Sequence, residues 1–150
     1  MQIPAKTEYA IRALLTLAAS DISVSAEHLA QEQDLPAKFL GAILSDLRRG
    51  GLVTSQRGPE GGFRLARPAD QLTVADIIRA VEGPLASVRG GPPEDSEYTG
   101  AAEALLRVWI AVRANLRKVV EHVTVADVAG GRLPKAVDKL AEDPEAWTTR

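Results

Sequence analysis

The stretch that decides the fold is residues 36–68, which read PAKFLGAILSDLRRGGLVTSQRGPEGGFRLARP. Its first half repeats apolar residues at the three-to-four spacing of one helical face, at Phe39, Leu40, Ile43, Leu44 and Leu47. Pro36 suits the first turn of such a helix, because its missing N–H costs nothing there, and the glycine pair at 50–51 ends it. Two short strands, residues 52–56 and 63–65, follow around a glycine-rich turn. The stretch therefore predicts a helix followed directly by a β-hairpin, which is a wing.

Two further helices are predicted upstream of this stretch. Thr7 can cap the first, whose apolar face would be formed by Ile11, Leu14, Leu15 and Ala18. Ser25 can cap a second, short helix with Leu29 and Ala30 on its buried side. Three short helices with tight connections in the first fifty residues predict a helix-turn-helix.

Downstream of the hairpin the sequence predicts one more helix and then a loop. Thr73 and Asp76 match a capping box that precedes a short apolar run ending at Val81. Residues 83–100 differ in composition, with four glycines, three prolines and an acidic run. Loops of this length are usually functional or disordered.

A long helix is predicted from Ala101 to Val123. Its apolar residues recur with an average period of 3.5, at Leu105, Trp109, Val112, Leu116, Val119 and Val123. Such a narrow stripe on a long terminal helix is typical of a helix–helix interface, so we expect a homodimer, with packing inside one chain as the alternative. Thr124 to Asp127 repeats the capping-box pattern and predicts a short final helix.

The predicted fold is mainly α with a small β-hairpin. Residues 1–82 would form a winged helix-turn-helix DNA-binding domain, and residues 83–100 a loop or linker. Residues 101–129 would hold the dimerisation helix and the short following helix, and residues 130–150 a polar tail.

Composition excludes several classes of function. The 150 residues contain no cysteine and two histidines, so disulfides, thiolate-bound metals and a cysteine nucleophile are excluded. No motif pairs a nucleophile with a base, so an enzyme is not expected. No segment has the roughly 18 apolar residues of a membrane span, and a cytoplasmic protein with no membrane contact is expected.

Charge is distributed unevenly along the chain. Residues 36–67 carry six basic and two acidic residues, a net of +4 within a chain of net −2. These bases fall on the predicted third helix and wing, as in a DNA-binding module; a solvated basic face is the alternative. Arg57, freed by adjacent glycines at the hairpin tip, can reach a narrow minor groove. The candidate DNA-binding residues are Ser25, His28, Ala37, Lys38, Gly41, Ala42, Arg48, Arg57, Gly58, Gly61, Gly62 and Arg64.

Several strings in this sequence resemble the IscR/NsrR/CymR family of bacterial winged-helix regulators. They are Y-A-I-R-A-L-L at 9–15, L-R-R-G-G-L-V at 47–53, R-G-P-E-G-G-F-R-L-A-R-P at 57–68 and V-A-D-I-I-R-A-V-E-G-P at 74–84. The resemblance implies a homodimeric transcription factor on a pseudo-palindromic double-stranded operator. It also implies a recognition helix in the major groove and a wing arginine, matching Arg57, in the minor groove.

The sequence departs from that family in two places. Sensing members hold an iron–sulfur cluster with three cysteines in the loop that corresponds to residues 83–104, and this chain has none. The resemblance is therefore to a cluster-free branch without this cofactor, and Glu8, where some members place a fourth ligand, is expected to be an ordinary helix N-terminal residue. Residues 83–100 remain open as a former sensor loop, an effector lid or a spacer.

The second departure is in the recognition helix. Gly41 and Ala42 stand where family members often carry base-reading side chains, and neither can hydrogen-bond a base edge through its side chain. We therefore expect modest sequence specificity. The function expected is a dimeric DNA-binding regulator, a repressor, that responds to a small-molecule effector or a partner protein. The alternative is a winged-helix module for protein–protein contacts with weak DNA binding.

Overall fold

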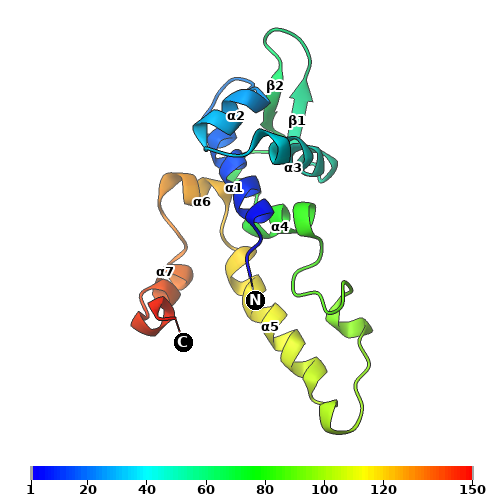
Figure 1. The fold of residues 1–150 in the computed structure, drawn as a ribbon. Coiled ribbons are helices and arrows are strands. Elements are labelled where there is room, and N and C mark those ends of the chain that lie inside the picture. The colour runs from blue at the N-terminus through cyan, green and yellow to red at the C-terminus, as the bar shows by residue number, and fades with distance from the viewer. Residues whose placement is uncertain (1, 150) are drawn as a thin grey trace.

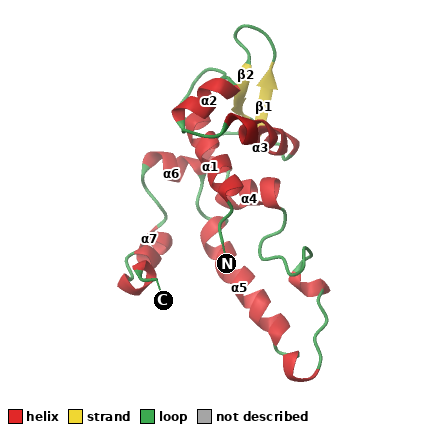
Figure 2. Ribbon diagram, viewed as in Figure 1, coloured by secondary structure: helices red, strands yellow, loops and turns green. Residues whose placement is uncertain are grey.

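The computed structural model describes residues 2–149. Figures 1 and 2 show the hairpin and most of the helices gathered at one end of the molecule, with one long helix extending away from them. The helices are α1 (Ala5–Ala18), α2 (Ala26–Glu32), α3 (Ala37–Arg49), α4 (Val74–Glu82), α5 (Leu105–Val120), α6 (Val125–Gly130) and α7 (Lys135–Ala141). The hairpin consists of β1 (Val53–Gln56) and β2 (Gly62–Leu65). The predicted fold, mainly α with a winged helix-turn-helix, is confirmed.

The core lies where α1, α3 and α4 meet. Leucines at positions 14, 40, 44, 47 and 52 and Ile77 are at most 2% exposed. The spacing of the apolar residues in α3 accounts for this, because Leu40, Ile43, Leu44 and Leu47 fall on one helical face. Burial of this face orients α3 so that its opposite face is exposed to solvent.

Local capping signals set the starts of α2, α4 and α6 as predicted. The Ser25 hydroxyl accepts a hydrogen bond from the His28 N–H at 3.2 Å and begins α2. Both capping boxes are formed: Thr73 with Asp76 at α4, and Thr124 with Asp127 at α6. These reciprocal bonds satisfy backbone N–H groups that a helix start leaves without partners.

The wing is an antiparallel pair in which Val53 lies opposite Leu65 and Gln56 opposite Gly62. It is joined to the segment before α2 by a bridge between Val24 and Phe63, whose backbones exchange hydrogen bonds of 2.8 and 3.0 Å. The helix-turn-helix and the wing are therefore connected through the backbone.

Three predicted details at α1 and α3 are wrong. Thr7 does not cap α1: the helix begins at Ala5, and Thr7 is buried inside it, donating a hydrogen bond to Glu82 at 3.3 Å. Phe39 is not part of the buried face of α3, because it is 62% exposed. It lies beside Tyr9 in a small apolar groove between α1 and α3. Pro36 stands at the N-cap rather than within the first turn.

The helix predicted from Ala101 to Val123 is shorter in the structure. A separate 3₁₀ turn covers Gly100–Ala102, and α5 begins at Leu105 and ends at Val120. Val123 lies beyond the helix, where it is buried and its carbonyl accepts a hydrogen bond from the Val74 N–H at 2.9 Å. The apolar seam on α5 itself thus comprises five residues: Leu105, Trp109, Val112, Leu116 and Val119.

Residues 83–100 fold back onto α5 rather than running free. The Trp109 indole N–H donates to the Tyr98 hydroxyl at 3.1 Å, and the Arg113 guanidinium pairs with Glu94 at 2.5 Å. The Glu94 backbone N–H and Arg113 both lower the pKa of the Glu94 carboxyl. Within the predicted polar tail the structure contains α7, which we did not predict. Among the described residues, no helix is both long and apolar enough to cross a membrane.

Candidate nucleic-acid interface

The exposed face of α3 is the first part of the candidate interface. A rotation of about 100° per residue places one set of side chains opposite the buried leucines, and each of them is exposed. We call this set the α3 stripe: Lys38, Gly41, Ala42, Ser45, Arg48 and Arg49. It is open to a DNA groove along the whole length of the helix.

The middle of the α3 stripe has little side-chain volume. A Cβ placed on Gly41 would have no atom within 4 Å among the described residues, and Ala42 and Ala37 are exposed. Methyl groups can contact thymine but cannot hydrogen-bond a base. We did not predict Ser45, which lies one turn beyond Gly41 and adds a hydroxyl. Its distance of seven residues from Lys38, two helical turns, is the signal that could have revealed it.

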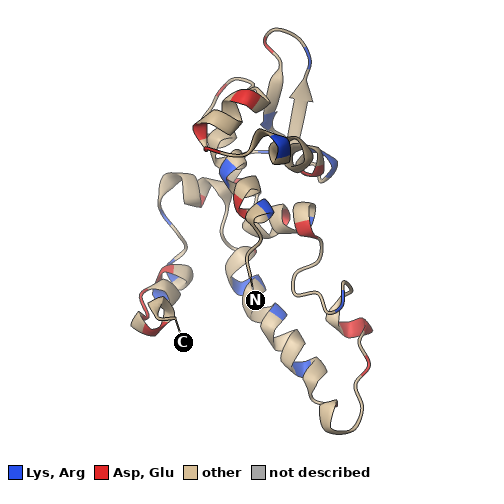
Figure 3. Ribbon diagram, viewed as in Figure 1, with Lys and Arg blue, Asp and Glu red and all other residues tan. Residues whose placement is uncertain are grey.

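The wing tip is the second part. Arg57 is exposed directly after β1, and Gly58 adopts a φ of +110° in the turn that follows. Gly61 and Gly62 complete the turn close to other backbone segments. Figure 3 shows basic positions on both the wing and α3. The predicted glycines therefore form the turn that presents Arg57 to solvent.

Two arginines of the predicted set are held by serine hydroxyls. Arg48 donates to Ser55 at 3.3 Å, and the Arg64 Nε donates to Ser23 at 3.0 Å. We predicted neither serine; the Ser23 contact joins residues 41 positions apart, which no local pattern could indicate. Each bond orients a guanidinium group that would otherwise be mobile at the surface.

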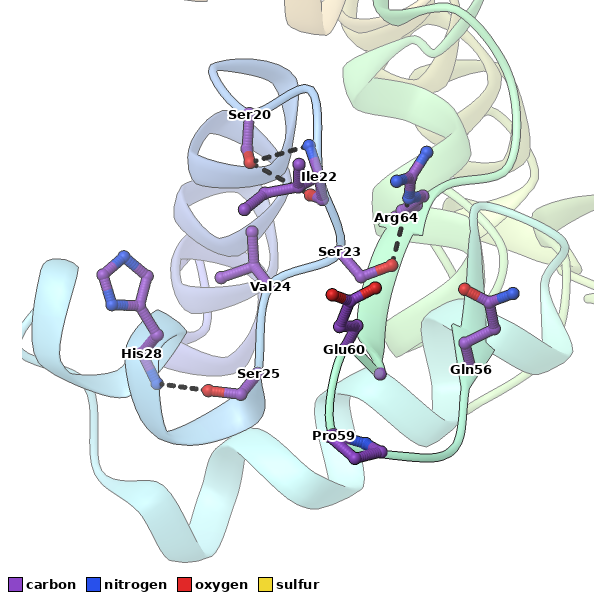
Figure 4. Close-up of a pocket in the computed structure, with 11 residues that line it drawn as sticks. Ser20, Ile22, Ser23, Val24, Ser25, His28, Gln56, Pro59, Glu60 and Arg64 are labelled. Atoms are coloured by element: carbon purple, nitrogen blue, oxygen red, sulfur yellow. Dashed lines mark hydrogen bonds between the residues drawn. The ribbon is translucent and has the colours of Figure 1, made fainter.

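The predicted residues on α2 lie at the edge of the same surface. His28 is exposed and its Nε2 lies 3.7 Å from the Glu32 carboxylate. Ser25 is exposed beside it and uses its oxygen as the helix cap. Both residues line an open cleft of about 710 Å³ between α2 and the wing, and Figure 4 shows the Ser25 side chain on the side of the wing and the His28 imidazole pointing away from it.

An acidic residue close to the α3 stripe is neutralised by bases. Asp46 lies 2.7 Å from the Lys6 ammonium and 3.2 Å from Arg49. The hydrogen bond from Lys6 is the main cause that lowers the pKa of the Asp46 carboxyl. This pairing limits the charge with which Asp46 would repel a phosphate.

The residues considered for a metal do not come together. Glu8 is exposed and pairs with Arg12 at 3.4 Å, four residues along α1. Within residues 2–149 no three His, Cys, Asp or Glu side chains are grouped so that they could hold a metal ion. The residues present therefore do not fit an iron–sulfur cluster.

An exposed recognition helix beside a basic wing defines a winged helix-turn-helix DNA-binding protein. A family model described as Rrf2, iron-dependent transcriptional regulator, matches residues 3–131. The chain belongs to the Rrf2 family of helix-turn-helix transcriptional regulators, and the predicted resemblance is confirmed. It is a family of regulators, not of enzymes.

Individual relatives match over most of their length. A Mycobacterium tuberculosis protein described as an HTH-type transcriptional regulator is 49% identical over 97% of this chain and 92% of its own. The regulator CymR of Bacillus subtilis is 34% identical over 86% of this chain and 90% of its own. The structure of CymR, the global cysteine regulator of B. subtilis, superposes with a TM-score of 0.72 at 32% identity, covering 87% of this chain and 97% of CymR.

Proposed function

We propose that this protein is a homodimeric, sequence-specific transcriptional repressor that needs no iron–sulfur cluster. The observation that carries the proposal is the placement of Lys38, Ser45 and Arg57 on exposed parts of α3 and the wing, within residues 36–67, whose net charge is +4. The α3 stripe would enter the major groove and Arg57 the adjacent minor groove.

The five seam residues of α5 support the dimer. Among the described residues of α5 none is fully buried, although Leu105, Trp109, Val112, Leu116 and Val119 are apolar or aromatic. Val108, beside the seam, is 50% exposed. A second copy of α5 would cover these side chains and place two recognition helices on the two halves of a palindromic operator. A dimer seated there would block a promoter.

The lack of cysteine supports a regulator without a cluster. Thiolates hold such clusters in proteins, and the chain has no cysteine to supply them. The signal would then be a small-molecule effector or a partner protein acting in the bacterial cytoplasm.

The test is a titration of promoter-region DNA followed by fluorescence anisotropy, with random duplex as competitor. We expect the protein to prefer its own promoter region over random duplex at moderate salt. Arg57→Ala should weaken operator binding by roughly 1–3 kcal/mol and reduce the preference for A·T at the contacted position. Lys38→Ala should also weaken binding. The salt slope, which is the slope of the logarithm of the binding constant against the logarithm of the salt concentration, will show whether Lys38 contacts a phosphate.

The control is Arg132→Ala, which removes the same charge from an exposed position after α6, away from the wing. If Arg57→Ala and Arg132→Ala bind promoter DNA with equal affinity, the proposed role of Arg57 in the minor groove is wrong. If the wild type binds promoter and random duplex equally weakly, the protein-interaction module becomes the better description.

A further inference from the structure

We propose that Ser23 and Arg64 form a clamp for one backbone phosphate of the DNA, at the junction between the helix-turn-helix and the wing. The proposal rests on the DNA-binding function proposed above and adds a specific binding site to it. Ser23 precedes α2 and Arg64 lies on β2, so the clamp links the two parts of the domain that would meet different grooves.

The geometry of Arg64 leaves its outer edge available. Its Nε donates to the Ser23 hydroxyl at 3.0 Å, which fixes one edge of the planar guanidinium. Within residues 2–149 its two terminal nitrogens make no hydrogen bond or ion pair with the protein, and the residue is exposed. A guanidinium held in this way presents terminal N–H donors to an anionic oxygen, and phosphate is a preferred partner of arginine.

The surroundings match a phosphodiester rather than a small apolar molecule. The cleft of about 710 Å³ is open to solvent and contains the hydroxyls of Ser20, Ser23 and Ser25. A second cleft of about 480 Å³ shares Ser23 and Arg64 and is lined by Thr54 and Ser55. The Ser23–Arg64 pair therefore lies where two polar clefts meet, as a DNA strand running past the wing would require.

Glu60 on the wing opposes this site. It lines the larger cleft, and Figure 4 shows Ser23 lying between it and Arg64. A phosphate is therefore expected on the Arg64 side, away from the carboxylate. Because Glu60 repels an anion in the same cleft, Glu60→Gln should tighten DNA binding about two- to fivefold at low salt.

The experiment compares Arg64→Gln with Arg132→Gln, which removes the same charge outside the interface. Binding is measured against salt on both promoter DNA and random duplex. We expect Arg64→Gln to weaken binding about 5- to 20-fold and to reduce the salt slope by about 0.9 for each subunit bound. We expect Arg132→Gln to change neither quantity appreciably. Equal slopes for the two variants would overturn the clamp.

The role of Ser23 is tested by a double-mutant cycle. Ser23→Ala should weaken binding two- to fivefold alone and have no further effect when combined with Arg64→Gln, because it acts by orienting that side chain. Ser23→Thr retains the hydroxyl and should bind like the wild type. Additive effects of the two substitutions would show that Ser23 does not act through Arg64. Thermal unfolding of each variant confirms that the fold is intact.

A set of promoter duplexes with single methylphosphonates identifies the phosphate directly. One neutralised position per half-site should weaken the wild type but leave Arg64→Gln unchanged; if no position does so, the clamp is wrong. These measurements can refute the clamp and the proposed function independently. Loss of promoter preference would refute the regulator, while the slope on random duplex would still report on the clamp.

Discussion

Gly62 provides the sharpest test of how the wing is attached to the helix-turn-helix. It begins β2 with a φ of +144°, and a Cβ at this position would lie 2.5 Å from the Val24 carbonyl oxygen and 3.0 Å from the Ser25 nitrogen. Both obstacles are backbone atoms, so no side-chain rotation can relieve the clash. In Gly62→Ala the segment before α2 and the hairpin must move apart.

The cost can be worked out from these contacts. Backbone strain at a φ that L-residues rarely adopt is about 1–3 kcal/mol. The movement would also break the two backbone hydrogen bonds between Val24 and Phe63, of 2.8 and 3.0 Å. Each of them contributes about 1 kcal/mol to the free energy of unfolding. The expected loss is thus about 3–5 kcal/mol, which for a chain of this length lowers Tm by roughly 10 °C.

Gly58→Ala is the matched control. Gly58 also has a positive φ, of +110°, but a Cβ there would have no atom within 4 Å among the described residues. It therefore shares the backbone strain of Gly62→Ala without the clash. The assay is thermal and urea unfolding of both variants beside the wild type. If Gly62→Ala unfolds no earlier than Gly58→Ala, the close approach of Val24 is not the reason for a glycine at position 62.

Three other predictions address different parts of the molecule. Leu116→Asp should convert the proposed homodimer to a monomer in sedimentation velocity, and a variant that still sediments as a dimer would refute the α5 seam as its interface. The Asp46 pKa is lowered chiefly by Lys6, so the resulting stability is present above about pH 4 and is lost as the pH falls through the lowered pKa. Lys6→Met should reduce this loss of stability at acid pH. An unchanged pH dependence of Tm would contradict the prediction. Gly41→Ala should raise stability by about 0.5–1 kcal/mol, because the site is open and helical; urea unfolding checks the sign.

The elements predicted correctly are those whose signals are local. Ser25 and the two capping boxes act within three residues of themselves, and the spacing of leucines in α3 decides its buried face without reference to other segments. The same holds for the wing, whose turn needs glycine for its backbone conformation. Such features could be predicted because their cause and their effect lie in the same few residues.

The features that escaped prediction depend on distant partners. Thr7 resembles a cap, but its hydroxyl contacts Glu82, 75 positions away. Phe39 fits the apolar spacing of α3, yet the position of α1 leaves it largely exposed beside Tyr9. Ser23 carries no signal at all until β2 brings Arg64 beside it. Helical periodicity and capping patterns cannot supply such contacts, because they are set by how the helices pack.

The composition of the α3 stripe indicates how the proposed regulator would recognise its operator. Gly41 and Ala42 offer no hydrogen-bonding side chain, so on the part of the stripe before Arg48 and Arg49 direct contact with base edges falls to Lys38 and Ser45. A recognition helix with no hydrogen-bonding side chain at positions 41 and 42 discriminates bases weakly, whereas an arginine in the minor groove senses groove width. The affinity for the operator should therefore exceed the affinity for random DNA by about 10³-fold, the lower end of the range typical of sequence-specific DNA-binding proteins. It should depend more on the A·T content beneath the Arg57 wing than on any base beneath α3.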